Sequence, residues 1–203
     1  MRHRIAACRS GSSAGSAEIY DVDVIVEAAS HMEFTALEAQ LRRLGFQQPQ
    51  EEGAPVCRWM SGNLLLDFMP TDPAILGFSN RWYRAAVEDA QPVHIGDRDI
   101  RLITAPYFLA TKMEALHSRG KDDYRMSRDL EDIITVIDGR AEIVQEVHLS
   151  EAGVRRYLSD EFRSLLSSRD FLEALPGHLL PDAASQERAT LVLGRMRDMV
   201  IEG

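Results

Sequence analysis

The sequence predicts an α+β protein in which a group of strands is followed by a helical C-terminal half. Residues 20–27 alternate between polar and β-branched side chains, and two further pairs of apolar runs follow before residue 104. After Pro106 the apolar residues recur at helical spacing. With 45% hydrophobic and 27% charged residues, the 203-residue chain has the composition of a globular protein.

The N-terminal 45 residues predict an arm, a strand and a helix. Residues 1–19 are rich in small polar side chains without periodicity, which is typical of an irregular or disordered arm. The run YDVDVIVE at 20–27 predicts a strand. Ser30 is a suitable N-cap for a helix over 31–44, and Gly45 is a suitable end.

Two hairpins are predicted in the middle of the chain. Runs at 56–60 and 63–69 are joined by Ser61-Gly62, and the second run does not alternate, which predicts a strand inside the sheet, covered on both faces. After a loop over 70–80 and a helix over 81–89, the second hairpin follows, with strands at 93–95 and 100–103.

The rest of the chain predicts helices. The expected ranges are 107–118, a helix that Ser127 caps and that runs to about 137, and helices near 150–166, 169–175 and 183–201.

Charge and cysteine usage narrow the class of protein. The net charge of -9 argues against a dedicated DNA-coating protein, because phosphate binding depends on clustered Lys and Arg. Cys8 and Cys57 form neither a zinc signature nor a disulfide framework. No apolar run approaches the roughly 20 residues of a membrane span, and the first residues lack a signal-peptide core. We expect a reduced, cytoplasmic protein without a membrane partner.

Three aspartates are the candidate metal ligands. Asp21 and Asp23 lie two apart on a predicted strand and therefore project from the same face. Asp67 lies inside an apolar run, where an unpaired carboxylate would cost several kcal/mol. A cation, an arginine or a position at the sheet edge must account for it.

Carboxylates on adjacent strands suit Mg²⁺, a hard ion that takes oxygen ligands and keeps positions for substrate phosphates. Such a cluster supports phosphoryl or nucleotidyl transfer. The alternative is that Asp21 and Asp23 mark a solvated strand end, which is the commoner meaning of an isolated DxD.

Four motifs resemble those of the AbiEii-type abortive-infection toxins, within the DNA polymerase β-like nucleotidyltransferase superfamily. They are DVDVIVE at 21–27, LLLDFMPTD at 64–72, LATKMEAL at 109–116 and SRDLEDI at 127–133. The resemblance covers residues 20–140 and implies a nucleotidyltransferase-like core there, with a mixed sheet flanked by helices. Residues 141–203 then form a helical C-terminal region.

The resemblance implies a role for each matching residue. Asp21 and Asp23 match the metal-binding aspartates, and Asp67 matches the third carboxylate or the base for the acceptor hydroxyl. Lys112 matches a lysine that contacts nucleotide phosphates, and Asp129 matches a polar residue of the site.

Each of the two helical matches has a simpler explanation. Lys112 can be a solvated lysine on an amphipathic helix, and Asp129 can stabilise a helix N-terminus. Asp132, the second aspartate of the SRDLEDI motif, can anchor Arg128 or a neighbouring loop.

The family also places a Gly-Ser or Gly-Gly pair ahead of DxD, where backbone amides cradle the triphosphate. Gly11-Ser12 is the better spaced candidate for nucleotide binding, and Gly15-Ser16 is too close to Asp21. No regular element is predicted around either pair, so the glycine motif is atypical.

The resemblance implies a Mg²⁺-dependent transferase that moves a nucleotide from an NTP to a hydroxyl of RNA, such as tRNA, or of protein. It also implies a toxin with an antitoxin partner. The alternative is a catalytically degenerate nucleotidyltransferase fold that serves as a binding module.

Overall fold

The computed structural model describes residues 5–10, 20–28, 30–119, 123–180 and 182–201, without the side chains of 5–10, 20, 21 and 119. The chain divides into two compact units, Met1–Thr104 and Ala105–Gly203, which are described separately below. The division follows the last strand, whereas the sequence placed a boundary at residue 140. The mixture of strands and helices confirms the α+β class.

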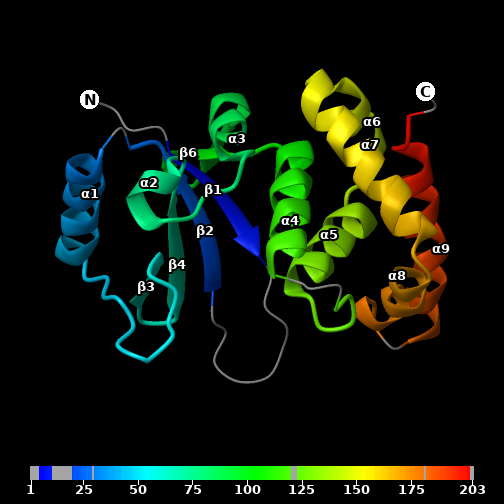
Figure 1. Cartoon of the computed structure of the whole chain (residues 1–203), viewed down its shortest axis with the longest axis horizontal. Coiled ribbons are helices and arrows are strands. Elements are labelled where there is room, and N and C mark those ends of the chain that lie inside the picture. The colour runs from blue at the N-terminus through cyan, green and yellow to red at the C-terminus, as the bar shows by residue number, and fades with distance from the viewer. Residues whose placement is uncertain (1–4, 11–19, 29, 120–122, 181, 202–203) are drawn as a thin grey trace. The chain divides into compact units, whose positions relative to one another are not determined.

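In its described residues, the first unit contains a six-stranded mixed sheet (Figure 1). Its order is β3-β4-β2-β1-β6-β5; β2 runs parallel to β4 and β1 parallel to β6, while the other neighbouring pairs are antiparallel. The strands are β1 (Ile5–Ser10), β2 (Tyr20–Val26), β3 (Arg58–Ser61), β4 (Leu64–Pro70), β5 (Gln91–Ile95) and β6 (Arg98–Leu102).

One face of β2, β4 and β3 forms an apolar core with helix α1 (His31–Arg43). Ser30 caps α1 by accepting a hydrogen bond from the Glu33 amide at 3.2 Å, as the sequence predicts. The core combines every second residue of the strands with one stripe of α1. Its buried members are Val24, Val26, Ala28, Phe34, Leu37, Leu41, Trp59, Phe68 and Ile75.

The alternation that buries these residues directs their neighbours to the opposite face of the sheet. That face carries Asp23 on β2, Asp67 on β4 and Arg58 on β3, and we call it the aspartate face. Helix α3 (Tyr83–Asp89) contacts β1 and β2. The Tyr83 hydroxyl donates a hydrogen bond to Met69 Sδ at 2.9 Å, two residues beyond Asp67.

The second unit is helical in its described part. It contains α4 (Ala105–Arg119), α5 (Arg128–Gly139), α6 (Ile143–Leu149), α7 (Ala152–Ser167), α8 (Arg169–Ala174), the 3-10 helix η1 (Leu175–His178) and α9 (Ala183–Asp198). Its core draws on almost every helix. The largest fully buried side chains are Leu109, Met113, Leu130, Ile133, Ile134, Ile137, Ile143, Leu158, Phe162, Phe171 and Leu175.

Residues 5–10 correct the prediction of an irregular arm over 1–19. They form β1, which pairs with β2 on one side and β6 on the other. Ala6, Ala7 and Cys8 carry little strand preference of their own, so tertiary pairing decides their structure. Two short helices were also not predicted: α6, and α2 (Pro73–Leu76), which Asp72 caps within the expected loop.

The first hairpin turn lies one residue later than the sequence suggested. Ser61 pairs with Leu64, so the turn residues are Gly62 and Asn63 instead of Ser61 and Gly62. Gly62 has φ 58°, a left-handed conformation that glycine adopts without steric cost and that tight hairpin turns require. The shift changes which residues of β3 and β4 lie opposite each other.

Strand β4 lies between β3 and β2, as the non-alternating run predicts. Its aspartate-face residues, however, are only partly buried.

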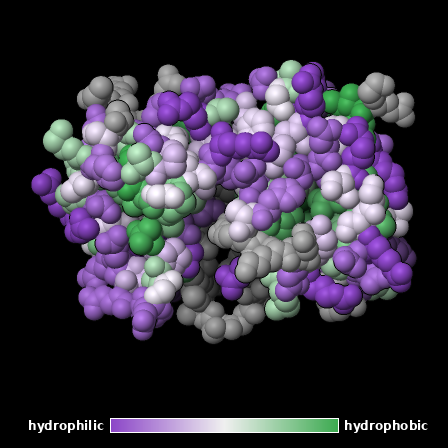
Figure 2. Space-filling view, in the orientation of Figure 1, coloured by the Kyte–Doolittle hydropathy of each residue, from purple (hydrophilic) through white to green (hydrophobic). Residues whose placement is uncertain are grey.

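Figure 2 shows that hydrophilic residues predominate on the face in view. Within the described residues, no helix combines the length and apolar character needed to cross a membrane.

Candidate functional site

Asp23 and Asp67 lie side by side in the sheet. They are register partners on the parallel strands β2 and β4, whose neighbours Val24 and Phe68 pair next along the ladder. Adjacent strands are about 5 Å apart, and register partners project from the same face. The structure therefore brings together two carboxylates from segments that are more than forty residues apart in the sequence.

Asp67 is paired with an arginine. Arg58 lies opposite Asp67 on β3, and its Nε donates to Oδ1 at 2.8 Å while its Nη2 donates to Oδ2 at 2.7 Å. The two side chains are 28% and 15% exposed, so the bidentate pair is partly shielded from solvent. Of the three explanations that the sequence leaves open for Asp67, the structure supports pairing with an arginine.

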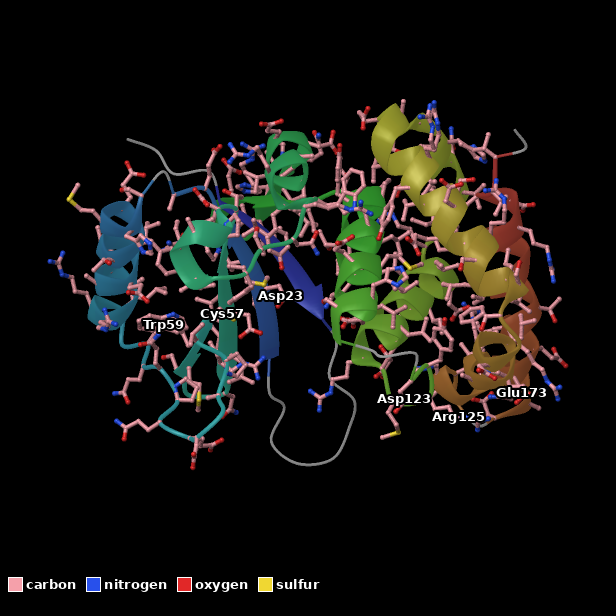
Figure 3. All side chains as sticks on the ribbon, viewed as in Figure 1. Asp23, Cys57, Trp59, Asp123, Arg125 and Glu173 are labelled. Carbon is pink, nitrogen blue, oxygen red and sulfur yellow. The ribbon has the colours of Figure 1, made fainter. Side chains whose placement is uncertain are left out.

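The pKa of the Cys57 thiol reflects both its burial and the negative potential around these carboxylates. Its thiol is buried, and burial together with the charge of Asp67 raises its pKa to about 11. The charge of Asp23 raises the pKa further, and Arg58 lowers it. Figure 3 shows Asp23 and Cys57 near β2 and β4 of the first unit. Cys57 therefore lies within electrostatic reach of Asp23, Asp67 and Arg58.

The donors on the aspartate face suit a hard divalent cation, because carboxylate oxygens are the ligands that Mg²⁺ prefers. Within the described part of the chain, no group of three or more His, Cys, Asp or Glu gathers closely enough to hold a metal ion. The Asp21 side chain lies outside the described residues, although its backbone continues β2 two positions before Asp23. Asp67 has both oxygens engaged by Arg58, so a metal ion bound there would share the carboxylate with the guanidinium or compete with it.

Lys112 and Asp129 lie in the second unit, where they form an ion-pair cluster with Asp132. Lys112 Nζ on α4 is 2.7 Å from Asp132 Oδ2 and 3.8 Å from Asp129 Oδ1 on α5. The three side chains are 12–13% exposed, and Lys112 also lies 5.7 Å from the centre of the Phe108 ring. The lysine is therefore held within its unit, and the closer acid is Asp132.

Gly11 and Ser12 lie outside the described residues, and their predicted role in nucleotide binding stays a prediction. The sequence places them immediately after β1, which ends at Ser10 opposite Asp21.

Arg58 and Cys57 are the residues near Asp67 that the sequence did not predict for the site. Arg58 is the one charged residue of the RWMS strand, and a turn at Gly62-Asn63 places it opposite Asp67. A turn at Ser61-Gly62 would place it opposite Leu65 instead. The correct turn position was the signal that could have identified Arg58.

Compared with protein-family models, with curated proteins and with solved structures, the chain shows no significant match.

Proposed function

We propose that this chain is a Mg²⁺-dependent nucleotidyltransferase that transfers a nucleotide from an NTP to a hydroxyl of RNA or protein. The observation that carries the proposal is the placement of Asp23 beside Asp67 on parallel strands, on the face opposite the apolar core. A buried core does not require two adjacent carboxylates there, and such a pair is costly unless it binds a cation or a positive side chain.

The order of the first strands also supports the proposal. Strand β1 runs antiparallel to β2, and Gly11-Ser12 follows it directly in the sequence, ten residues before the aspartate motif begins. A glycine-serine pair in this position supplies backbone amides that can bind phosphate oxygens. The resemblance places such a pair at the start of the sheet, and here the pair follows the sheet strand β1 in the sequence.

The chemistry follows from the carboxylates. Asp21 and Asp23 would hold the metal, which when bound activates the acceptor hydroxyl and stabilises the leaving pyrophosphate. The hydroxyl oxygen forms a bond to the α-phosphorus, the bond to pyrophosphate breaks, and the hydroxyl proton passes to a base. Asp67 is the candidate for that base, or else the third metal ligand.

The second candidate function is a binding module that keeps the fold without the chemistry. The Arg58–Asp67 pair favours it, because a bidentate arginine satisfies the partly buried carboxylate without any metal ion. Under this alternative neither Mg²⁺ nor an NTP would stabilise the protein.

Label transfer tests the two candidates. The full chain is incubated with each of four α-³²P-labelled NTPs, Mg²⁺ and total RNA, and incorporation into RNA and into protein is measured. Asp23→Asn should lower incorporation at least about a hundredfold, because it removes a charged ligand of the ion. Full activity in this variant would contradict the mechanism.

A matched control is Asp97→Asn. The Asp97 side chain is 95% exposed and lies in the turn between β5 and β6. Its substitution should therefore leave incorporation unchanged. The melting temperatures of both variants should be close to that of the wild type, which separates lost chemistry from lost folding.

The toxin role, the tRNA acceptor and the antitoxin partner are further proposals from the resemblance. Expression of the wild type should arrest bacterial growth, and expression of Asp23→Asn should not.

A further inference from the structure

Three charged side chains lie on the aspartate face, and Arg58 is the positive one that offsets the repulsion between the two carboxylates. Asp23 and Asp67 are neighbours in register, and two adjacent carboxylates repel each other unless a positive group lies close. Arg58 supplies that group from the other side of Asp67. Its removal would leave the two acids without this compensation, and a divalent cation could then supply it.

The geometry of the pair makes arginine and cation competitors. Arg58 uses two nitrogens to engage both oxygens of Asp67, at 2.8 and 2.7 Å. A metal ion that takes an Asp67 oxygen as ligand places a second positive charge beside the guanidinium, and the repulsion between the two cations favours the release of Arg58. The same planar fork of donors binds phosphate oxygens as well as it binds a carboxylate. A displaced Arg58 therefore has a suitable new partner in a triphosphate.

We propose that Arg58 exchanges partners when a metal–nucleotide complex binds. Arg58 releases Asp67, which then binds the cation, and donates its hydrogen bonds to a phosphate oxygen of the nucleoside triphosphate. This inference rests on the proposed transferase function and names a nucleotide-positioning residue for it. The exchange conserves the pairing of Asp67 and Arg58 with opposite charges, because the cation takes over Asp67 and a phosphate takes over the guanidinium. The Arg58 side chain is 28% exposed, so a ligand can approach it from solvent.

The exchange predicts effects of opposite sign on two ligands. In Arg58→Gln, the competitor for Asp67 is absent, so MgCl₂ alone should bind roughly tenfold more tightly than to the wild type. Mg²⁺ with an equimolar mixture of ATP, GTP, CTP and UTP should bind roughly tenfold more weakly, because the phosphate contact is lost. Titration calorimetry measures the first effect, and the dependence of melting temperature on nucleotide concentration measures the second.

Two further variants keep the test sharp. Arg58→Lys retains the charge without the fork, so Mg²⁺ affinity should stay close to that of the wild type while nucleotide affinity falls. Arg42→Gln is the matched control. Arg42 lies on α1, 4.9 Å from the ring of Trp59 on the opposite face of the sheet, and its loss should change neither affinity.

The outcomes separate this inference from the function beneath it. Suppose that the wild type binds both Mg²⁺ and the nucleotides and that Asp23→Asn binds neither. If Arg58→Gln then lowers both affinities or changes neither, Arg58 has only a structural role and the exchange is overturned. If the wild type itself binds neither Mg²⁺ nor the nucleotides, the proposed function and the exchange both fail.

Discussion

At the scale of single residues, the electrostatic surroundings of Asp67 and Cys57 explain the charge state that each side chain keeps. Asp67 is an acid inside an apolar strand, and the bidentate contact from Arg58 makes its charge tolerable there. Cys57, in contrast, stays uncharged: burial, together with the charge of Asp67, holds its thiol neutral. A buried neutral thiol is a poor nucleophile, so Cys57 should react slowly with thiol reagents at neutral pH.

Cys57 should also make stability depend on alkaline pH. Its pKa is about 11 in the folded protein against an ordinary 9.0. Between these values the unfolded chain loses the thiol proton and the folded chain keeps it, so the free energy of unfolding falls as pH rises. The loss contributed by this group is about 2 to 3 kcal/mol across that interval.

Urea unfolding of the wild type and of Cys57→Ala at pH 8 and pH 11 measures this contribution. The wild type should lose more stability than the variant over that range, because both share every other titrating group. Equal losses in the two proteins would contradict a raised pKa for Cys57.

At the scale of elements, α4 and α5 are joined by the Lys112 cluster as well as by apolar packing. Ser127 caps α5 by accepting from the Leu130 amide at 3.2 Å, and Asp129 follows in the first turn of the helix. This agrees with the sequence prediction of the cap and with the dipole explanation of Asp129. What the sequence could not show is that both aspartates of the motif reach the same lysine on another helix.

Removal of Lys112 should therefore destabilise the second unit. Lys112→Met keeps the length of the side chain but removes the cation that Asp132 and Asp129 share, which should cost about 3 kcal/mol. Added to Lys112→Met, the second substitution Asp132→Asn should restore part of that stability, more than Asp129→Asn does, because Asp132 is the closer acid. Urea unfolding of these variants and of the single carboxylate variants measures the couplings. Equal recovery by the two asparagines would contradict the asymmetry of the cluster.

The sequence predicted most elements to within a few residues because their signals are local. Helical spacing, the caps at Ser30 and Ser127, and the alternation of YDVDVIVE all lie within one segment. Strand β1 and the turn at Gly62-Asn63 were not predicted, because their structure depends on partners elsewhere in the chain. A one-residue shift of a turn changes every cross-strand pair, and here it decided the partner of Asp67.

At the scale of the whole molecule, the chain consists of two units with separate interiors. The first contains the sheet and the aspartate face, and the second contains a helical core with many fully buried side chains. The division at Thr104–Ala105 falls between β6 and α4, not at residue 140. The helix with Lys112 and the SRDLEDI motif thus belong to the second unit, although the resemblance groups them with the aspartates.

The second unit should fold by itself. Residues 105–203, expressed alone, should show the circular dichroism of a helical protein and unfold cooperatively in urea, because their apolar core is contributed by their own helices. A fragment that is largely unfolded, with a weak and gradual transition, would show that this core depends on the first unit. The variant Leu158→Ala, which opens a cavity at a fully buried position, should lower the midpoint of the same transition.

The sequence by itself determined the α+β class, the positions of most helices and strands, and the presence of carboxylates where an apolar strand has no need of them. These properties follow from periodicity and capping, which act over a few neighbouring residues. Only the tertiary structure decided that Asp23 adjoins Asp67, that Arg58 holds Asp67, and that Lys112 is held by Asp132. Each of these pairs joins different strands or helices, and the register and packing between such elements depend on the folded chain as a whole.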